Sequence, residues 1–194
     1  MGIKNIIFIH VPKTAGVAIG HGFARDGHLK DGFRNNHSTA QQRKKQKNLK
    51  WDEDTIVLGV IRNPYDRLWS VYEFYSKKLR SISLKLSFTD FILTFEEKFH
   101  PKGEQFNTCY NYLTDEDGKF LTTDIIRFEN LEKEYDDFCQ KYNIKNTLRH
   151  DNKNDKKGTP PEYTKEMREV VEKVFRKDLD TFNYSYDDYL RSIK

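Results

Sequence analysis

The chain has 194 residues, of which 36% are hydrophobic, 33% charged and 14% aromatic. This length and aromatic content exclude a disordered chain and fit a single domain over residues 1–194. The 34 Lys and Arg and the 30 Asp and Glu leave a net charge of only +4, which by itself indicates no partner. With no apolar stretch long enough to cross a bilayer and no signal peptide, we expect a cytoplasmic protein.

Strands and helices alternate along the chain. Residues 3–11 and 55–61 are almost continuously apolar, which is typical of strands buried on both faces. A short helix is expected over residues 17–23 and a longer one over residues 65–79. Further along, the pattern predicts a strand over 124–128 and helices over 131–142 and 164–175, with basic, polar connections over 34–50 and 145–162. This order predicts an α/β fold with a mostly parallel central sheet and helices on both faces.

A Pro-Lys-Thr-Ala-Gly turn, residues 12–16, joins the first expected strand to the first helix. Backbone N–H groups and the positive end of a helix dipole would meet an anion at such a turn. Gly16 permits a close approach of the backbone, and Lys13 supplies a positive charge. The full P-loop spacing G-x-x-x-x-G-K-[ST] is absent. By itself, the turn is equally a plain strand-to-helix connection with a solvated lysine.

A second candidate segment follows the second strand and opens the long helix. It reads Arg62-Asn63-Pro64-Tyr65-Asp66-Arg67-Leu68-Trp69-Ser70-Val71-Tyr72. Ligands of open α/β sheets gather at the carboxyl ends of the strands, so Arg62 is expected to face the same crevice as Lys13. Ser70 would offer a hydroxyl to the same anion, and Asp66 is expected to cap the helix. Alone, the segment is more simply a helix start with a surface arginine.

In this order, the two motifs resemble those of the sulfotransferases that use 3′-phosphoadenosine 5′-phosphosulfate (PAPS), more narrowly the carbohydrate, Golgi-type branch and its bacterial and viral relatives. Weaker matches follow in family order at His37-Ser38-Thr39-Ala40, Arg127-Phe128-Glu129-Asn130-Leu131, His150-x-Asn152 and residues 163–184. The resemblance covers nearly the whole chain. It implies a P-loop-like sulfotransferase fold and an enzyme that moves a sulfuryl group from PAPS to an acceptor hydroxyl without a metal, leaving adenosine 3′,5′-bisphosphate.

The resemblance also implies roles for individual residues. The loop for the 5′-phosphosulfate would be formed by Pro12, Lys13, Thr14, Ala15, Gly16, Val17 and Ala18. Lys13 would contact the bridging oxygen and stabilise its charge, as positioned cations do in phosphoryl transfer. Arg62 and Ser70 would bind the 3′-phosphate, because a guanidinium matches a phosphate well. Arg127 and Phe128 complete this part of the nucleotide site.

The loop after residue 145 closes over the nucleotide in such enzymes. Its candidates for nucleotide contacts are Arg149, Lys156 and Lys157, although a solvated basic loop is the simpler interpretation of any one of them. The chain departs from its relatives directly after Gly16. There it carries Val17 and Ala18, whereas the relatives usually place Thr or Ser, so cofactor binding would depend more heavily on the backbone N–H groups.

An alcohol acceptor needs a general base, and histidine suits this role because it titrates near working pH. His37 lies between the two phosphate motifs, where the family carries an acceptor-side histidine, so we expect it to be the base. The alternative is an exposed loop histidine without a role. The other five histidines are less suited to the role: His10 is expected to pack or orient, His150 belongs to the closing loop, and His21, His28 and His100 lack motif support.

The acceptor is the least specified part of the site. A basic stretch beside His37, formed by Arg43, Lys44, Lys45, Lys47 and Lys50, would suit an acidic glycan or be merely solvated. Trp69 and Tyr72 could stack on a sugar or pack. A carbohydrate is expected by resemblance, a small-molecule alcohol remains open, and we expect no nucleic-acid partner. Two other classes are alternatives: a P-loop-like nucleotide kinase that needs Mg²⁺, and a non-catalytic binder of polyanions.

Overall fold

The computed structural model describes residues 5–29, 37–47, 49, 51–77, 86–100, 106–145, 148 and 159–193. The chain forms two compact units. Unit 1 comprises Met1–Ile61 and Asn111–Lys153, and unit 2 comprises Arg62–Tyr110 and Asn154–Lys194. The single domain expected over residues 1–194 stays a prediction.

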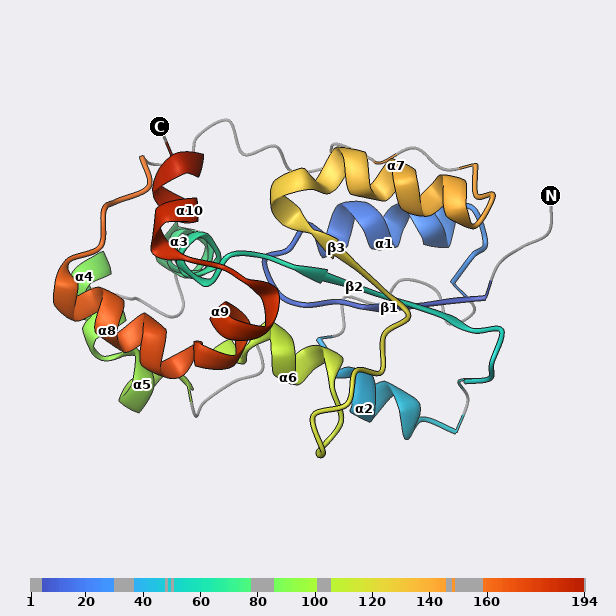
Figure 1. Ribbon diagram of the computed structural model, residues 1–194, viewed down its shortest axis with the longest axis horizontal. Coiled ribbons are helices and arrows are strands. Elements are labelled where there is room, and N and C mark those ends of the chain that lie inside the picture. The colour runs from blue at the N-terminus through green and yellow to red at the C-terminus, as the bar shows by residue number, and fades with distance from the viewer. Residues whose placement is uncertain are drawn as a thin grey trace. The chain divides into compact units, whose positions relative to one another are not determined.

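Unit 1 contains a three-stranded parallel sheet, as expected from the apolar runs (Figure 1). Its strands are β1 (Ile6–Ile9), β2 (Ile56–Ile61) and β3 (Asp124–Arg127), in the order β1-β2-β3. Ile9 pairs with Gly59, and Ile61 pairs with Arg127. The first strand ends at Ile9, two residues before its expected end, since the Val11 amide turns back to the Ile9 carbonyl (3.1 Å) and Pro12 has no N–H to donate.

Helices cover both faces of this sheet, which confirms the expected layers. On one face lie α1 (Gly16–Arg25) and α7 (Leu131–Lys141), whose Phe23 and Phe138 join Phe8 and Leu58 in one apolar core. On the other face, a Cβ added at Gly59 would lie 2.5 Å from Leu113 Cδ2 at the end of α6 (Cys109–Leu113), so Leu113 packs closely on the sheet there. The short helix α2 (Ala40–Lys44) lies on this same side (Figure 1).

Unit 2 is helical. It contains α3 (Pro64–Lys77), α4 (Phe88–Leu93), α5 (Phe95–Lys98), α8 (Lys165–Val174), α9 (Arg176–Phe182) and α10 (Tyr186–Ser192). Aromatic side chains dominate its core, among them Tyr65, Phe91, Phe95, Phe175 and Tyr189. Few residues therefore fill a large volume, as the high aromatic content suggested. Within the described part of the chain, no helix has the length and apolar character that crossing a membrane requires.

Candidate functional site

The turn between β1 and α1 has an unusual backbone conformation. Lys13 and Ala15 adopt left-handed conformations, with φ of 66° and 62°. Such angles are uncommon for residues with a Cβ. Thr14 is fully buried, and its hydroxyl donates to the Val11 carbonyl (2.8 Å), so this side chain holds the loop in shape.

Helix α1 begins directly after this turn. Ala15, its N-cap residue, makes no side-chain capping bond, and the first helical turn holds no acid. The amide of Ala18 donates to the Ala15 carbonyl (3.1 Å), and its methyl group is buried, whereas Val17 is partly exposed. The opening turn thus combines a helix dipole and backbone N–H groups with a neighbouring lysine, a combination that favours an anion.

His10 fills the space beside Gly16. A Cβ added at Gly16 would lie 1.9 Å from Cδ2 of the His10 ring, so this position accepts only glycine without a shift of the ring. Burial, together with the charges of His37 and Lys13, lowers the pKa of His10 to about 3. His10 is therefore neutral near pH 7, which agrees with the packing or orienting role expected of it.

The structure brings His37 to the same turn. Its Nδ1 lies 3.1 Å from the His10 carbonyl oxygen, and the two imidazole centroids are 4.4 Å apart. The backbone beyond His37 is fixed by a capping box, in which the Thr39 hydroxyl accepts from the Gln42 amide and the Gln42 side chain accepts from the Thr39 amide. The helix that this box starts, α2, lies in the segment 34–50 that the sequence predicted to be only a connection.

In the second motif, Arg62 is buried rather than on the surface, with 3% of its area exposed. Its Nε donates to Asp66 Oδ2 at 2.6 Å. The expected capping role of Asp66 is wrong, because Asn63 occupies that position and its Oδ1 accepts from the Tyr65 amide (3.1 Å). Asp66 instead holds the guanidinium of Arg62. Ser70, two turns along α3, is also buried.

The parallel register sets the ends of the strands along one edge of the sheet. Ile9 and Ile61 end β1 and β2, and Arg62 follows Ile61 in the chain. Arg127 ends β3, and its amide donates to Glu134 Oε2 (2.6 Å), while Phe128 packs against the core of unit 1. Lys13 belongs to unit 1 and Arg62 to unit 2, so the crevice expected to hold both stays a prediction.

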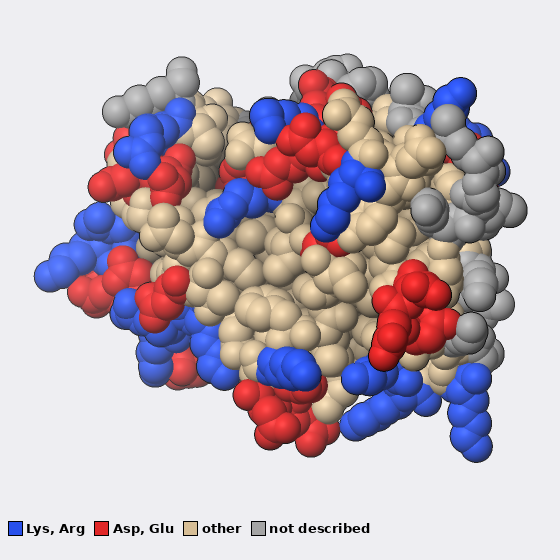
Figure 2. All heavy atoms as spheres, turned by 45° about the vertical axis from the view of Figure 1, so that its right-hand side comes forward, with Lys and Arg blue, Asp and Glu red and all other residues tan. Residues whose placement is uncertain are grey.

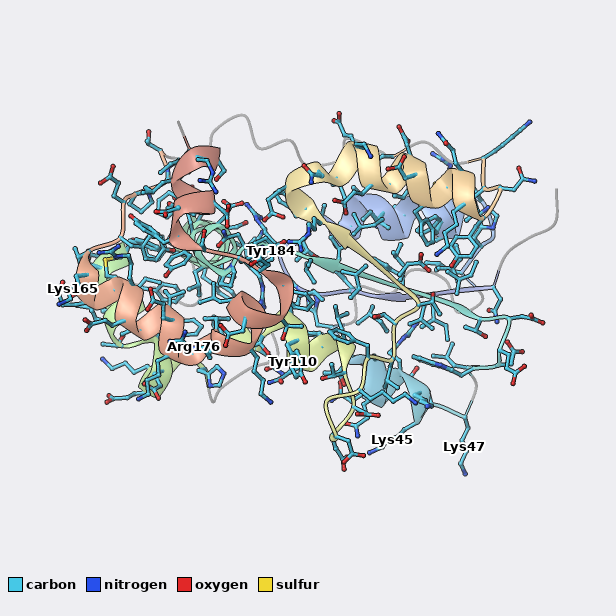
Figure 3. The ribbon with its side chains drawn as sticks, in the orientation of Figure 1. Lys45, Lys47, Tyr110, Lys165, Arg176 and Tyr184 are labelled. Carbon is cyan, nitrogen blue, oxygen red and sulfur yellow. The ribbon has the colours of Figure 1, made fainter. Side chains whose placement is uncertain are left out.

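The basic candidates of the closing loop, Arg149, Lys156 and Lys157, lie outside the described residues. On the acceptor side, Arg43 is buried and so does not belong to a solvated basic stretch. Lys45 pairs with Glu116 at 3.3 Å, and Lys45 and Lys47 extend away from the end of α2 (Figure 3). Lys50 is not among the described residues.

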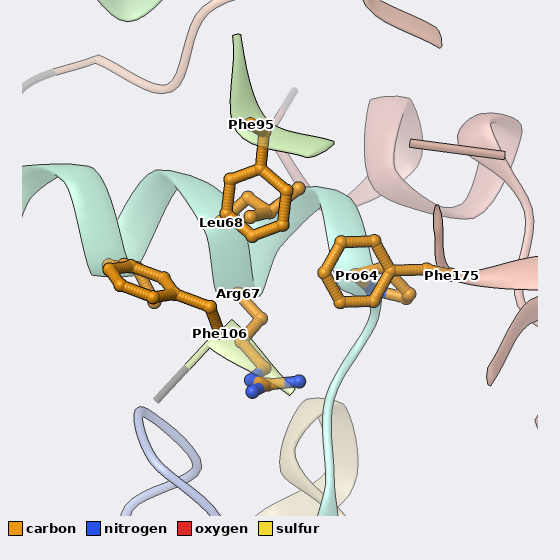
Figure 4. A pocket seen from close by; sticks show the side chains of 7 residues that line it. Pro64, Arg67, Leu68, Phe95, Phe106 and Phe175 are labelled. Carbon is orange, nitrogen blue, oxygen red and sulfur yellow. The ribbon is translucent and has the colours of Figure 1, made fainter. Parts of the chain in front are cut away.

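Trp69 and Tyr72 pack within unit 2. Their ring centroids are 5.7 Å apart, and the Phe88 ring stands against Trp69 at 5.1 Å. Because Trp69 is buried, the packing role that the sequence allowed for it is the one the structure shows. An apolar hollow nearby, lined by Pro64, Arg67, Leu68, Val71, Phe95, Phe106 and Phe175, is too small to admit a water molecule (Figure 4). We therefore assign it to packing.

A buried polar cluster in unit 2 escaped the sequence analysis. Asp178 is completely buried and accepts hydrogen bonds from the amides of Cys109 (2.8 Å) and Tyr110 (2.7 Å). Arg67 is also buried, and it donates to the Asn107 carbonyl (2.6 Å) and contacts the Cys109 sulfur (3.6 Å). Burial raises the pKa of the Cys109 thiol to about 12, which keeps it protonated and unreactive. Arg67 stands next to Leu68 and four residues before Val71, on the apolar side of α3. A charged residue at such a position was the signal that could have indicated the cluster.

The fold and the first turn define an α/β protein in which a turn with left-handed residues joins a buried strand to the uncapped start of a helix, with two histidines beside that turn. A protein-family model described as the sulfotransferase family matches residues 2–185, which is nearly the whole chain. The chain therefore belongs to the sulfotransferase family, whose members transfer sulfuryl groups to acceptor hydroxyls. Neither the search of curated proteins nor that of solved structures found a match.

Proposed function

We propose that this sulfotransferase uses PAPS as its donor and the hydroxyl of a carbohydrate as its acceptor. The observation that carries the proposal is the uncapped start of α1 next to Lys13, with His37 held against the same turn. The loop proposed to bind the anion and the proposed base, His37, would thus belong to the same unit. The narrower choice of a carbohydrate acceptor rests on the sequence resemblance.

The residues of the two motifs fit the donor's two charged ends. At the start of α1, the first helical turn holds no acid, so its backbone N–H groups suit a 5′-phosphosulfate. The Val17 and Ala18 side chains contribute no hydroxyl, so the backbone would hold this end. Arg62 and Ser70 would take the 3′-phosphate, with Asp66 fixing the guanidinium so that less side-chain freedom is lost on binding.

In this proposal, Lys13 and His37 act on opposite sides of the transfer. PAPS supplies an activated sulfuryl group. His37 accepts the proton of the acceptor hydroxyl, whose oxygen forms the new bond to sulfur as the bond from sulfur to the bridging oxygen breaks. The electron pair of that bond stays on the bridging oxygen, where the Lys13 ammonium stabilises the charge. The chain thus handles both the proton and the leaving charge with its own side chains.

The alternatives fit the chain less well. A nucleotide kinase is disfavoured by the family match and by the missing P-loop spacing. A binder of polyanions needs a continuous basic surface, but on the face in Figure 2 basic and acidic side chains are interspersed. In unit 1, Lys45 lies against Glu116, and Lys141 lies against Asp124. Charge of both signs weakens the attraction for a long polyanion.

Calorimetric titration with adenosine 3′,5′-bisphosphate, in the presence of a chelator, tests the donor class. We expect a dissociation constant on the order of micromolar for the wild-type chain. Arg62→Ala should weaken binding by about tenfold to a hundredfold, since it removes charge-assisted hydrogen bonds to phosphate. Arg62→Lys keeps the positive charge but loses the planar set of N–H donors of the guanidinium, and it should bind with intermediate affinity.

A transfer assay with PAPS and a panel of hydroxylated acceptors separates binding from chemistry. Lys13→Ala should bind adenosine 3′,5′-bisphosphate nearly as the wild type does, but should lose about a hundredfold to a thousandfold in kcat. Lys119→Ala, at an exposed lysine of the same unit, is the matched control and should change neither quantity. Near-normal turnover by Lys13→Ala would refute the role assigned to Lys13.

A further inference from the structure

The two histidines at the anion loop touch through both backbone and ring. His37 Nδ1 lies 3.1 Å from the carbonyl oxygen of His10, and the ring centroids are 4.4 Å apart. The His10 ring also lies against Gly16, where an added Cβ would approach its Cδ2 to 1.9 Å. This buried ring, the wedge, thus contacts both the start of α1 and His37.

We propose that His10 is a positioning residue that fixes the tautomer and the ring orientation of His37, so that the Nε2 lone pair of His37 is available to the acceptor hydroxyl. This inference rests on the proposed function, because it concerns the base of the same transfer. It assigns a role to His10, a residue that neither phosphate motif contains. His10 touches no reacting atom in this scheme and acts only through His37.

The tautomer follows from the hydrogen-bond partner. A carbonyl oxygen can accept but cannot donate, so the contact with His10 requires a proton on His37 Nδ1. In a neutral imidazole with a proton on Nδ1, the second nitrogen carries a lone pair. A backbone carbonyl orients catalytic and metal-binding histidines in the same way elsewhere. His37 therefore presents Nε2 as the atom that can take a proton.

The orientation of the His37 ring follows from its contact with His10 and from the fixed backbone beyond His37. The imidazole of His10 supports one side of the His37 ring, and His10 cannot move toward α1 because Gly16 already lies against it. Beyond His37, the Thr39–Gln42 capping box fixes the backbone, and the following Ala40 is completely buried. His37 is thus held from its own backbone and from the ring of His10.

The neutrality of His10 is part of this role. Burial, the charge of His37 and the charge of Lys13 all lower the pKa of His10, so the wedge carries no charge when the enzyme works. A positive ring at this position would repel both Lys13 and the protonated form of His37. A neutral, buried ring supports His37 without opposing the proton that His37 takes up.

Nitrogen NMR of ¹⁵N-histidine-labelled protein, recorded without any donor, tests the inference independently of activity. In the wild type we expect His37 to show a protonated Nδ1 and an unprotonated Nε2. His10→Ala keeps the backbone carbonyl but removes the ring that supports His37. His37 is then no longer held against this carbonyl and should give averaged shifts from both tautomers. His10→Phe keeps a planar ring and should preserve the wild-type pattern. His21→Ala, on the exposed side of α1, is the matched control and should leave the His37 signals unchanged.

Kinetics with PAPS supply a second readout. His10→Ala should lower kcat by about tenfold or more, with little change in the KM for the donor, because a base displaced from its line of attack costs rate rather than binding. His10→Phe should retain most of the wild-type kcat. A merely local loss of packing at the donor loop would instead raise the KM for the donor in His10→Ala, so the split between kcat and KM distinguishes the two roles.

The outcomes separate the two proposals. A wild-type His37 with the proton on Nε2 overturns the positioning role without any variant, and so does an unchanged tautomer in folded His10→Ala. Equal losses in His10→Ala and His10→Phe also overturn it. If the NMR results are as expected but no acceptor is sulfated, the positioning of His37 stands and the proposed function fails.

Discussion

At the scale of single residues, the turn between β1 and α1 depends on backbone angles that its sequence does not reveal. Lys13 and Ala15 both occupy the left-handed region, which costs an L-residue about 1–2 kcal/mol. The buried Thr14 hydrogen bond to Val11 offsets part of this cost. Gly16 was expected to let a ligand approach, and the structure shows a further reason for it, since the His10 ring occupies the space of a Cβ.

His10 should make the free energy of unfolding depend on pH. Its pKa is about 3 in the folded chain and 6.5 ordinarily, so the unfolded chain binds a proton that the folded chain excludes. His10 therefore does not change the free energy of unfolding above its ordinary pKa of 6.5. As the pH falls from there toward 3, the free energy of unfolding decreases by about 1.4 kcal/mol per pH unit. Urea unfolding of the wild type and His10→Phe at several pH values measures it. We expect a shallower slope in the variant, and identical slopes would contradict the assignment.

At the scale of elements, sustained patterns and the short helix after the first strand, α1, were predictable, whereas helices of seven residues or fewer were not. Strands β2 and β3 and helices α3, α7 and α8 lie within about two residues of their expected bounds, because each carries a sustained period or an unbroken apolar run. Helix α2 has five residues, too few to show a period. Its capping box, Thr39 with Gln42, was visible in the sequence and was the signal that could have found it.

Helix α6 could not be predicted because its start is stabilised from far along the chain. Asp178 in α9 accepts from the amides of Cys109 and Tyr110, across 69 and 68 residues. Burial raises the pKa of Asp178, while the nearby charge of Arg67 opposes that rise. No local pattern around residue 109 indicates such a partner. The capping of one helix by a buried carboxylate of another is a tertiary feature.

Replacing Asp178 should destabilise unit 2 strongly. Asp178→Ala removes the acceptor of the Cys109 and Tyr110 amides and the negative charge near the buried Arg67, a kind of loss that typically costs about 3–5 kcal/mol in the free energy of unfolding. Asp180→Ala removes an exposed carboxylate of the same helix, which lies 3.9 Å from Arg176, and should cost at most about 1 kcal/mol. Urea unfolding compares the two. A small, similar loss in both variants would show that Asp178 does not stabilise α6.

At the scale of the whole molecule, the two motifs pointed to the family correctly, and a family model matches residues 2–185. Parallel pairing of β1 with β2 could be inferred from two buried runs, since strands of that kind join through crossover connections. The burial of Arg62 against Asp66 could not, because an i,i+4 pair at a helix start is usually solvated. The tertiary structure buries this pair and so fixes the Arg62 guanidinium against Asp66, which the local sequence does not reveal.

The course of the chain through the two units predicts how the molecule unfolds. The chain passes from one unit to the other after Ile61, Tyr110 and Lys153, so neither unit is one continuous segment. Neither can then complete its core from a single stretch of chain, and a single domain over residues 1–194 should unfold in one cooperative transition. Differential scanning calorimetry should give equal calorimetric and van't Hoff enthalpies. Two separate transitions would refute the single domain.

The same experiment with adenosine 3′,5′-bisphosphate tests whether the ligand acts on the folded chain as a whole. Ligand at about a hundred times its dissociation constant should add about 2.7 kcal/mol to the free energy of unfolding and raise the Tm of the single transition by several degrees. Lys119→Ala should show the same shift as the wild type. At the same ligand concentration, Arg62→Ala should show a much smaller shift, because its weaker binding lowers the ratio of ligand to dissociation constant. An equal shift in Arg62→Ala would mean that Arg62 does not hold the phosphate.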